Sequence, residues 1–169
     1  IWFMQYSQRE FRFIDYLEGA GNGLDFYVRE LNNRQYTYVR HFLPHDIAVR
    51  ELGNKGKSRK QALVDLGIRE DMINTGKQSD PIDGINAARL VLPLCWFDEA
   101  RCAKGIKHLV AYSRDWDEKK KVWKDHPRHD QASHCADAFR EFAQSFEEVK
   151  KVQPRKPIEG RGGANSWLR

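Results

Sequence analysis

Two aspartates and one histidine have the surroundings expected of a site for phosphodiester chemistry. Asp46 follows Pro44 at the end of an apolar segment, and strand ends are where α/β folds hold reactive groups rigid and exposed. His134 and Asp137 are three residues apart, so on a helix their side chains share a face. Carboxylates are the expected ligands of Mg²⁺ and Mn²⁺, and two such ions ~4 Å apart can activate a water and stabilise the leaving oxygen of a phosphodiester.

The same residues have a plain structural interpretation, which the sequence leaves open. Aspartate is a preferred helix N-cap, so Asp46 could cap the segment that follows it. His134 and Asp137 could form a solvated pair on an exposed helical face. Two-metal chemistry usually uses more acidic groups than this, and His134 is the possible helper.

Basic residues gather in two places that could hold phosphates. The first precedes a predicted helix, whose N-terminus favours anions, and a solvated loop is the alternative there. The second alternates cations with Trp116 and Trp123, which suits a DNA-contacting hairpin, and an ordinary amphipathic hairpin is the alternative. The net charge of +5 and the pI of about 9.1 also suit a polyanionic partner. The two groups are Lys55, Lys57, Arg59 and Lys60, and Lys119, Lys120 and Lys121.

Aromatic and β-branched residues predict the elements that would position these groups. Residues 1–6 and 11–17 predict a hairpin, residues 24–31 a helix, and residues 36–43 a third strand. Helix start signals lie at Ser58, at Asp80-Pro81 and at Asp98, with Gly67 as a C-terminal glycine. A short strand is possible within 71–75, and the last helix runs from about 130 to 149. Residues 112–127 fit either a hairpin or a frayed helix end.

This order of elements predicts an α/β fold with a mixed sheet flanked by helices. Residues 1–150 form one domain, and residues 151–169, rich in Pro, Lys, Arg and Gly, form a flexible basic tail. No apolar run approaches the ~20 residues of a membrane span. Three scattered cysteines predict reduced, buried thiols, and a zinc site built from Cys102, Cys135 and nearby histidines fits no known spacing.

Several segments, taken together, resemble the C-terminal nuclease domain of the phage terminase large subunit. Residues 38–46 (YVRHFLPHD) look like the second acidic motif of that family, a strand leading into Pro-His-Asp. Residues 83–89 (DGINAAR) and 95–98 (CWFD) match a stretch common in these proteins. Residues 129–140 (HDQASHCADAFR) look like its final motif. The similarity covers roughly residues 1–145.

The resemblance implies a ribonuclease-H-like fold and a two-metal endonuclease that cuts concatemeric double-stranded viral DNA during packaging. Asp46 and Asp137 would be ligands of Mg²⁺ or Mn²⁺, and His134 a nearby ligand or proton-transfer residue. The partners would be DNA, the portal protein and the small terminase subunit. The protein would be phage- or prophage-encoded and act in the cytoplasm of the bacterial host.

One departure from the family pattern bears on activity. The first acidic motif of the family lies on a first strand that we expect to precede Ile1, so the sheet would lack that strand and the site one carboxylate. Asp15 matches no ligand. We therefore expect Mn²⁺ to support plasmid nicking by a chain extended upstream. The alternative function is a catalytically silent module that binds DNA or the portal, and a zinc-stabilised interaction domain is a third possibility.

Overall fold

The computed structural model describes residues 1–51 and 56–151, without the side chains at position 125 and from 146 to 151. The chain opens with an antiparallel hairpin in which β1 (Trp2–Ser7) pairs with β2 (Glu10–Tyr16). Its tight turn places Gln8 and Arg9 at positive φ, as two-residue hairpin loops require. On the other edge of β2, β5 (Cys95–Phe97) pairs in parallel, so the strand order is β1-β2-β5.

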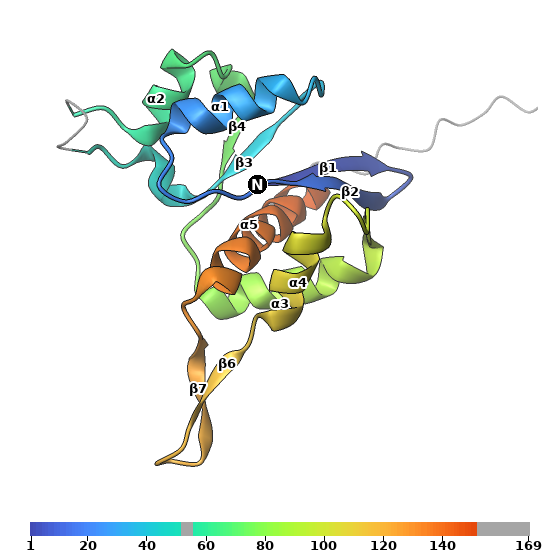
Figure 1. Cartoon of the computed structure of the whole chain (residues 1–169), viewed down its shortest axis with the longest axis vertical. Coiled ribbons are helices and arrows are strands. Elements are labelled where there is room, and N and C mark those ends of the chain that lie inside the picture. Colours follow the sequence, from blue (N-terminus) through green and yellow to red (C-terminus); the bar gives the residue numbers. More distant parts are fainter. Residues whose placement is uncertain (52–55, 152–169) are drawn as a thin grey trace, which may run out of the picture.

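A second small sheet lies beside two helices (Figure 1). β3 (His41–Leu43) runs parallel to β4 (Ile73–Thr75), and α1 (Leu24–Asn33) and α2 (Arg59–Asp65) pack nearby. Short 3-10 turns, η1 (His45–Ala48) and η3 (Glu70–Met72), follow β3 and precede β4. A small core of Val28, Ile47 and Leu63 joins α1, η1 and α2.

The strand predicted over residues 36–43 is too long, because only His41–Leu43 is extended and paired. β4 has only three residues, so it can pair with only three residues of β3. The preceding tyrosines are used otherwise: Tyr36 and Tyr38 contact the ring of Phe3, and Tyr38 donates its hydroxyl proton to Leu31 O. Aromatic residues here fill space between elements instead of extending a ladder.

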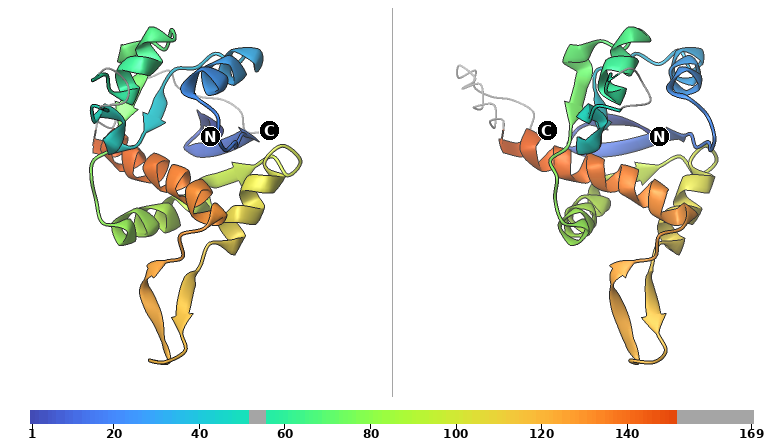
Figure 2. Two further views of the ribbon diagram at one scale, coloured as in Figure 1. Left: turned by 60° about the vertical axis from the view of Figure 1, so that its left-hand side comes forward. Right: turned by 90° about the vertical axis from the view of Figure 1, so that its left-hand side faces the viewer.

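The long helix α5 (Gln131–Lys151) carries the main core (Figures 1 and 2). Phe139 and Phe142, both buried, contact Phe13 of β2 at ring distances of 5.3 and 5.4 Å. Phe42 of β3 lies 6.2 Å from Phe142, so the same helix contacts both sheets. Flanking it are α3 (Pro81–Val91), which continues into the 3-10 turn η4 (Leu92–Leu94), and α4 (Ala103–Ala111).

Two of the three predicted helix starts, at Ser58 and Asp80, are confirmed. Asp80 accepts a hydrogen bond from Ile82 N, and Ser58 accepts one from Gln61 N. Gly67, at φ +101°, ends α2 in the left-handed conformation that favours glycine. These bonds satisfy backbone groups that a helix end otherwise leaves unpaired. The prediction at Asp98 is wrong, because Asp98 accepts hydrogen bonds from Ala100 N and Arg101 N in a turn, and α4 begins only at Ala103.

Residues 112–127 form a hairpin and not a helix end. β6 (Arg114–Asp117) pairs with β7 (Val122–Pro127) in a separate two-stranded sheet. In all three ribbon views this hairpin projects from the body of the molecule (Figures 1 and 2). Its base leads directly into α5.

The α/β class is confirmed, but the described residues form three small sheets and not the single mixed central sheet that was predicted. β1 and β3 each retain an edge with no strand partner in these parts of the chain. Across residues 1–51 and 56–151, no helix is both long and apolar enough to cross a bilayer. The predicted basic tail beyond Lys151 lies outside the described residues.

Candidate functional site

Asp46 lies in η1, the turn that follows β3. Pro44 is the first residue outside this turn and no side chain caps it, so the interpretation of Asp46 as a helix N-cap is wrong. Ile47 is buried in the small core and holds the turn in place, while the Asp46 side chain remains 53% exposed. The guanidinium of Arg59 approaches Asp46 Oδ2 to 4.0 Å and bonds more closely to Glu51 Oε1 at 2.6 Å. Asp46 is therefore fixed by the backbone and only loosely neutralised.

Asp137 lies near the start of α5 and is held by a neighbour on the same helix. Arg140 Nη2 donates to Asp137 Oδ1 at 2.5 Å, and Arg140 Nη1 donates to Pro81 O at 3.1 Å. The arginine also packs on Gly84 of α3, where a Cβ would lie 3.2 Å from Arg140 Cδ. Asp137 is thus oriented by the Arg140 side chain, which itself packs against α3.

Glu141 is the carboxylate that the sequence analysis missed. Its Oε2 is buried without a hydrogen-bond partner, although buried polar groups are nearly always paired. Burial raises the pKa of Glu141. The nearby carboxylates of Asp137 and Asp46 raise it further, while His45 and Arg140 oppose the rise. The i, i+4 spacing of Asp137 and Glu141 was the available signal, because such pairs share a helical face.

The route of the chain past Glu141 requires a glycine. Gly76, which follows β4, lies so close to Glu141 Oε2 that a Cβ there would overlap it. Gly76 N also donates to Leu43 O at 2.8 Å, which ties this linker to the end of β3. The end of β3, the linker after β4 and the third turn of α5 therefore meet at the Glu141 carboxylate.

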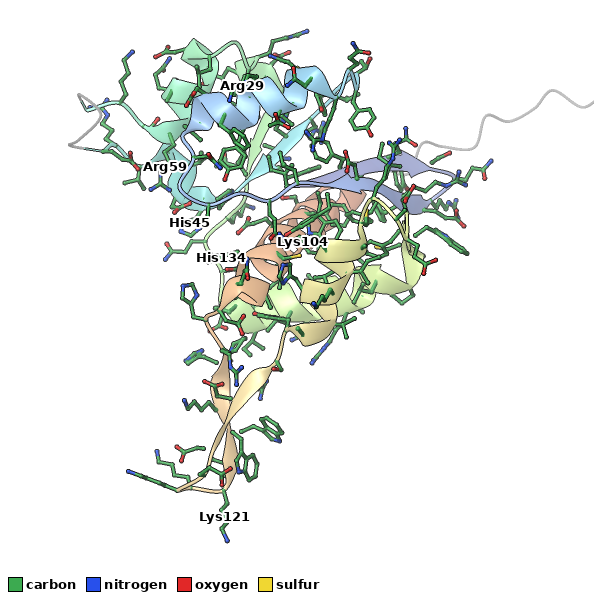
Figure 3. All side chains as sticks on the ribbon, viewed as in Figure 1. Arg29, His45, Arg59, Lys104, Lys121 and His134 are labelled. Atoms are coloured by element: carbon green, nitrogen blue, oxygen red, sulfur yellow. The ribbon has the colours of Figure 1, made fainter. Side chains whose placement is uncertain are left out.

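His134 is exposed and points toward a second histidine. Its ring lies 5.3 Å from that of His129 in an edge-to-face arrangement, and His129 Nδ1 lies 3.4 Å from Ser133 Oγ. Figure 3 shows His45 and His134 on the same side of the molecule in that view, and His134 lies near the start of α5. His129 is a further candidate, and the sequence analysis assigned it no role.

The carboxylates come close enough to influence one another, but they do not form a closed cage. Within the described ranges, no group of three or more His, Cys, Asp or Glu residues is arranged to hold a metal ion. The donor chemistry nevertheless suits a hard divalent cation, since an unpaired buried carboxylate oxygen lies within electrostatic range of two partly exposed carboxylates.

The cysteines offer nothing comparable for zinc. Cys95, Cys102 and Cys135 are free thiols, as predicted. Cys102 and Cys135 are buried and contact backbone oxygens of Phe13 and Gly105. Burial raises the pKa of Cys95 to about 12 and of Cys102 to about 11, which opposes the thiolate form that binds zinc.

The two predicted basic groups differ in their surroundings. Lys57, Arg59 and Lys60 each bond to a carboxylate, at 2.7, 2.6 and 2.9 Å, so their charge is largely compensated, and Lys55 lies outside the described residues. By contrast, no ion pair is formed by the side chains of the hairpin tip within the described chain. These tip residues are Lys119, Lys120 and Lys121.

Comparison with known proteins gives no relative. No family model, no curated protein and no solved structure matches this chain. The site must therefore be interpreted from its own geometry and from the sequence motifs.

Proposed function

We propose that this chain is a metal-dependent DNA endonuclease domain of the phage terminase type. The observation that carries the proposal is the buried, unpaired Oε2 of Glu141, which lies in electrostatic range of both Asp46 and Asp137. These two aspartates are about ninety residues apart in the sequence and come from the two segments that resemble acidic motifs of that family. An orphaned carboxylate in such a place is costly unless something neutralises it.

The carboxylates that would hold Mg²⁺ or Mn²⁺ are Asp46, Asp137 and Glu141, which would have to move closer together than they lie in the described residues. When bound there, the metal would supply charge stabilisation at the scissile phosphate and activation of a water. Arg140 holds the Asp137 carboxylate in a fixed direction. His134, exposed and next to His129, presents ring nitrogens that could accept or return a proton.

The proposed fold is ribonuclease-H-like, with one strand more than the described residues contain. The resemblance places that strand, with the family's first acidic motif, before Ile1. In support, β1 and β3 each retain an unpaired edge in the described parts, and α5 contacts both sheets. A strand between these edges would join the two sheets into one.

Double-stranded DNA is the proposed substrate. The uncompensated lysines at the tip of the β6–β7 hairpin are the best placed for phosphates, and Lys57, Arg59 and Lys60 could contribute only by exchanging their carboxylate partners. The portal protein, the small terminase subunit and a location in the cytoplasm of the bacterial host belong to the same proposal through the family resemblance.

Plasmid nicking tests the proposal. With Mn²⁺, supercoiled plasmid should be nicked by the chain, either as it is or extended at its N-terminus by the segment expected from the family. Asp46→Asn and Asp137→Asn should each abolish nicking while the melting temperature holds, because these side chains are 53% and 43% exposed. Glu99→Gln, which removes an exposed carboxylate outside the proposed site, is the matched control. Full activity in either aspartate variant would remove that residue from the site.

The second candidate function is a silent DNA- or portal-binding module. The pairing of Asp137 with Arg140 and the open arrangement of the carboxylates favour it. This candidate predicts salt-sensitive DNA binding without Mn²⁺-dependent nicking, even by the extended chain.

A further inference from the structure

The β6–β7 hairpin displays two tryptophans that the body of the protein does not cover. Trp116 and Trp123 are cross-strand partners whose rings lie 5.2 Å apart at an interplanar angle of 71°. Their exposed fractions are 41% and 57%. Tryptophan is usually well covered in folded proteins, so two adjacent exposed indoles form an unusual surface.

Ion pairs around Asp115 brace the hairpin. Asp115, at an irregularity in the β6–β7 register, bonds to Arg128 Nε at 2.7 Å and to Lys124 Nζ at 3.4 Å. Arg128 N also donates to Ser113 O at 3.0 Å and closes the base of the hairpin. The indoles are therefore not the only link between the strands.

The tip of the hairpin is basic and lies far from the body. Figure 3 shows Lys121 at the end of the projection, opposite the end that joins α5 near His134. Lys121 adopts φ 52°, and the side chains of Lys119, Lys120 and Lys121 form no ion pair within the described residues. Six residues of β7 span about 20 Å, the length of about six nucleotides of a duplex strand.

A surface that joins two exposed aromatic rings to uncompensated lysines is complementary to a nucleic acid strand. Lysines attract phosphates irrespective of sequence, whereas an indole gains most from the open face of a base. In an intact duplex those faces are covered by neighbouring base pairs. The tryptophans therefore favour DNA in which bases are unpaired or unstacked.

We propose that the β6–β7 hairpin is a DNA-binding arm in which Trp116 and Trp123 stack on unpaired bases while Lys119, Lys120 and Lys121 hold the phosphates of the same strand. This inference rests on the proposed function, because it takes DNA as the substrate. Since the base of the hairpin leads into the helix that carries His134 and Asp137, the arm would hold DNA beside the proposed cutting site.

Fluorescence anisotropy with the full chain, in EDTA, tests the arm. The probes are a labelled duplex and the same duplex with an internal unpaired segment. Wild type should bind the second probe more tightly. Trp116→Ala and Trp123→Ala should each weaken that binding by at least about five-fold, the loss expected for one stacked base, and should affect the intact duplex less. Trp123→Phe should restore most of the loss, and Trp96→Ala, an exposed tryptophan on β5, should change neither probe.

A second series addresses the lysines. Replacing Lys119, Lys120 and Lys121 together with glutamine should reduce the slope of log affinity against log salt by about two to three. The stacking role would be overturned if the tryptophan variants bound DNA with unchanged affinity, or if they lost the same affinity for both probes. The indoles would then stabilise the hairpin or contact another protein. If these variants still nick plasmid with Mn²⁺, the proposed nuclease function stands and only the DNA-binding role of the hairpin is rejected. Failure of wild type to bind either probe at low salt would remove both proposals.

Discussion

The guanidinium of Arg140 donates a hydrogen bond of 2.5 Å to Asp137 Oδ1 from one turn further along α5. The same side chain bonds to Pro81 O and packs on Gly84, so it connects the proposed site to the start of α3. Asp137 is consequently presented in one direction before any ligand arrives.

Arg140→Met should lower both stability and Mn²⁺ affinity. Methionine retains much of the packing of the stem but loses both hydrogen bonds, and we expect a cost of about 1 kcal/mol in unfolding free energy because Asp137 is partly exposed. Urea unfolding and Mn²⁺ titration by calorimetry measure the two effects. Arg140→Lys is the informative companion: one ammonium cannot reproduce the two directed bonds, so it should restore the charge but only part of the stability.

Glu141→Gln should stabilise the metal-free protein at neutral pH and not at acid pH. Burial raises the pKa of Glu141 in the folded state, so its charged form destabilises the fold. That cost is absent below the ordinary glutamate pKa, grows as pH rises through the raised value, and is fully present above it. Melting temperatures in EDTA at pH 4 and pH 8 should show a gain for the variant at pH 8 alone.

Mn²⁺ should reverse the order of the melting temperatures of wild type and Glu141→Gln at pH 8. If Glu141 holds the metal, Mn²⁺ should raise the melting temperature of wild type more than that of Glu141→Gln, by mass action on the folded state. Glu99→Gln should behave as wild type throughout. Equal Mn²⁺ shifts in all three proteins would exclude Glu141 as a ligand.

Gly105→Ala should destabilise the fold although alanine is the better helix former. A Cβ at Gly105 would overlap Trp2 and lie 2.9 Å from Cδ2 of Tyr16, and these rings pack against the main core. Overpacking of this kind costs about 1–3 kcal/mol, more than the ~1 kcal/mol of helix propensity gained. Thermal unfolding measures the difference. Lys107→Ala, on the exposed side of α4, should be neutral, and a melting temperature for Gly105→Ala at or above wild type would contradict the packing argument.

Arg34→Met should cost more stability than Asp15→Asn. Arg34 bonds to Asp15 Oδ2 at 2.9 Å and to Glu30 Oε2 at 3.0 Å, and its guanidinium lies 5.0 Å from the Phe3 ring. Removing the arginine leaves two partly buried carboxylates unpaired, at about 2 kcal/mol, whereas removing Asp15 leaves Arg34 paired with Glu30. Urea unfolding should show that the double variant, Arg34→Met with Asp15→Asn, loses less unfolding free energy than the two single variants lose in sum. Strict additivity would mean that the two side chains do not interact.

Sequence reasoning located the elements whose signals are local. The caps at Ser58 and Asp80 and the glycine at position 67 act within a few residues, so their motifs predicted helix ends correctly. Strand pairing is not local, and residues 36–40 look like strand because nothing in the sequence shows that β4 is only three residues long.

Within the candidate site, too, only the residues with local sequence signals could be predicted. Asp46 and Asp137 lie in recognisable motifs, but the position of Glu141 depends on the linker at Gly76 and on η1, which contact it only in the folded chain. The compensation of Lys57 by Asp65 likewise depends on how α2 is placed. Residue type and spacing therefore identified two carboxylates and could not identify the third.

α5 holds the aromatic core and the carboxylates on neighbouring turns. Phe139 and Phe142 fix its roll against β2, and Asp137 and Glu141 follow that roll rigidly because they belong to the same two turns. A repacking substitution deep in the interior, far from any solvent, would thus rotate both acidic groups together. The geometry of the proposed site is consequently constrained by these phenylalanines as much as by its acidic residues.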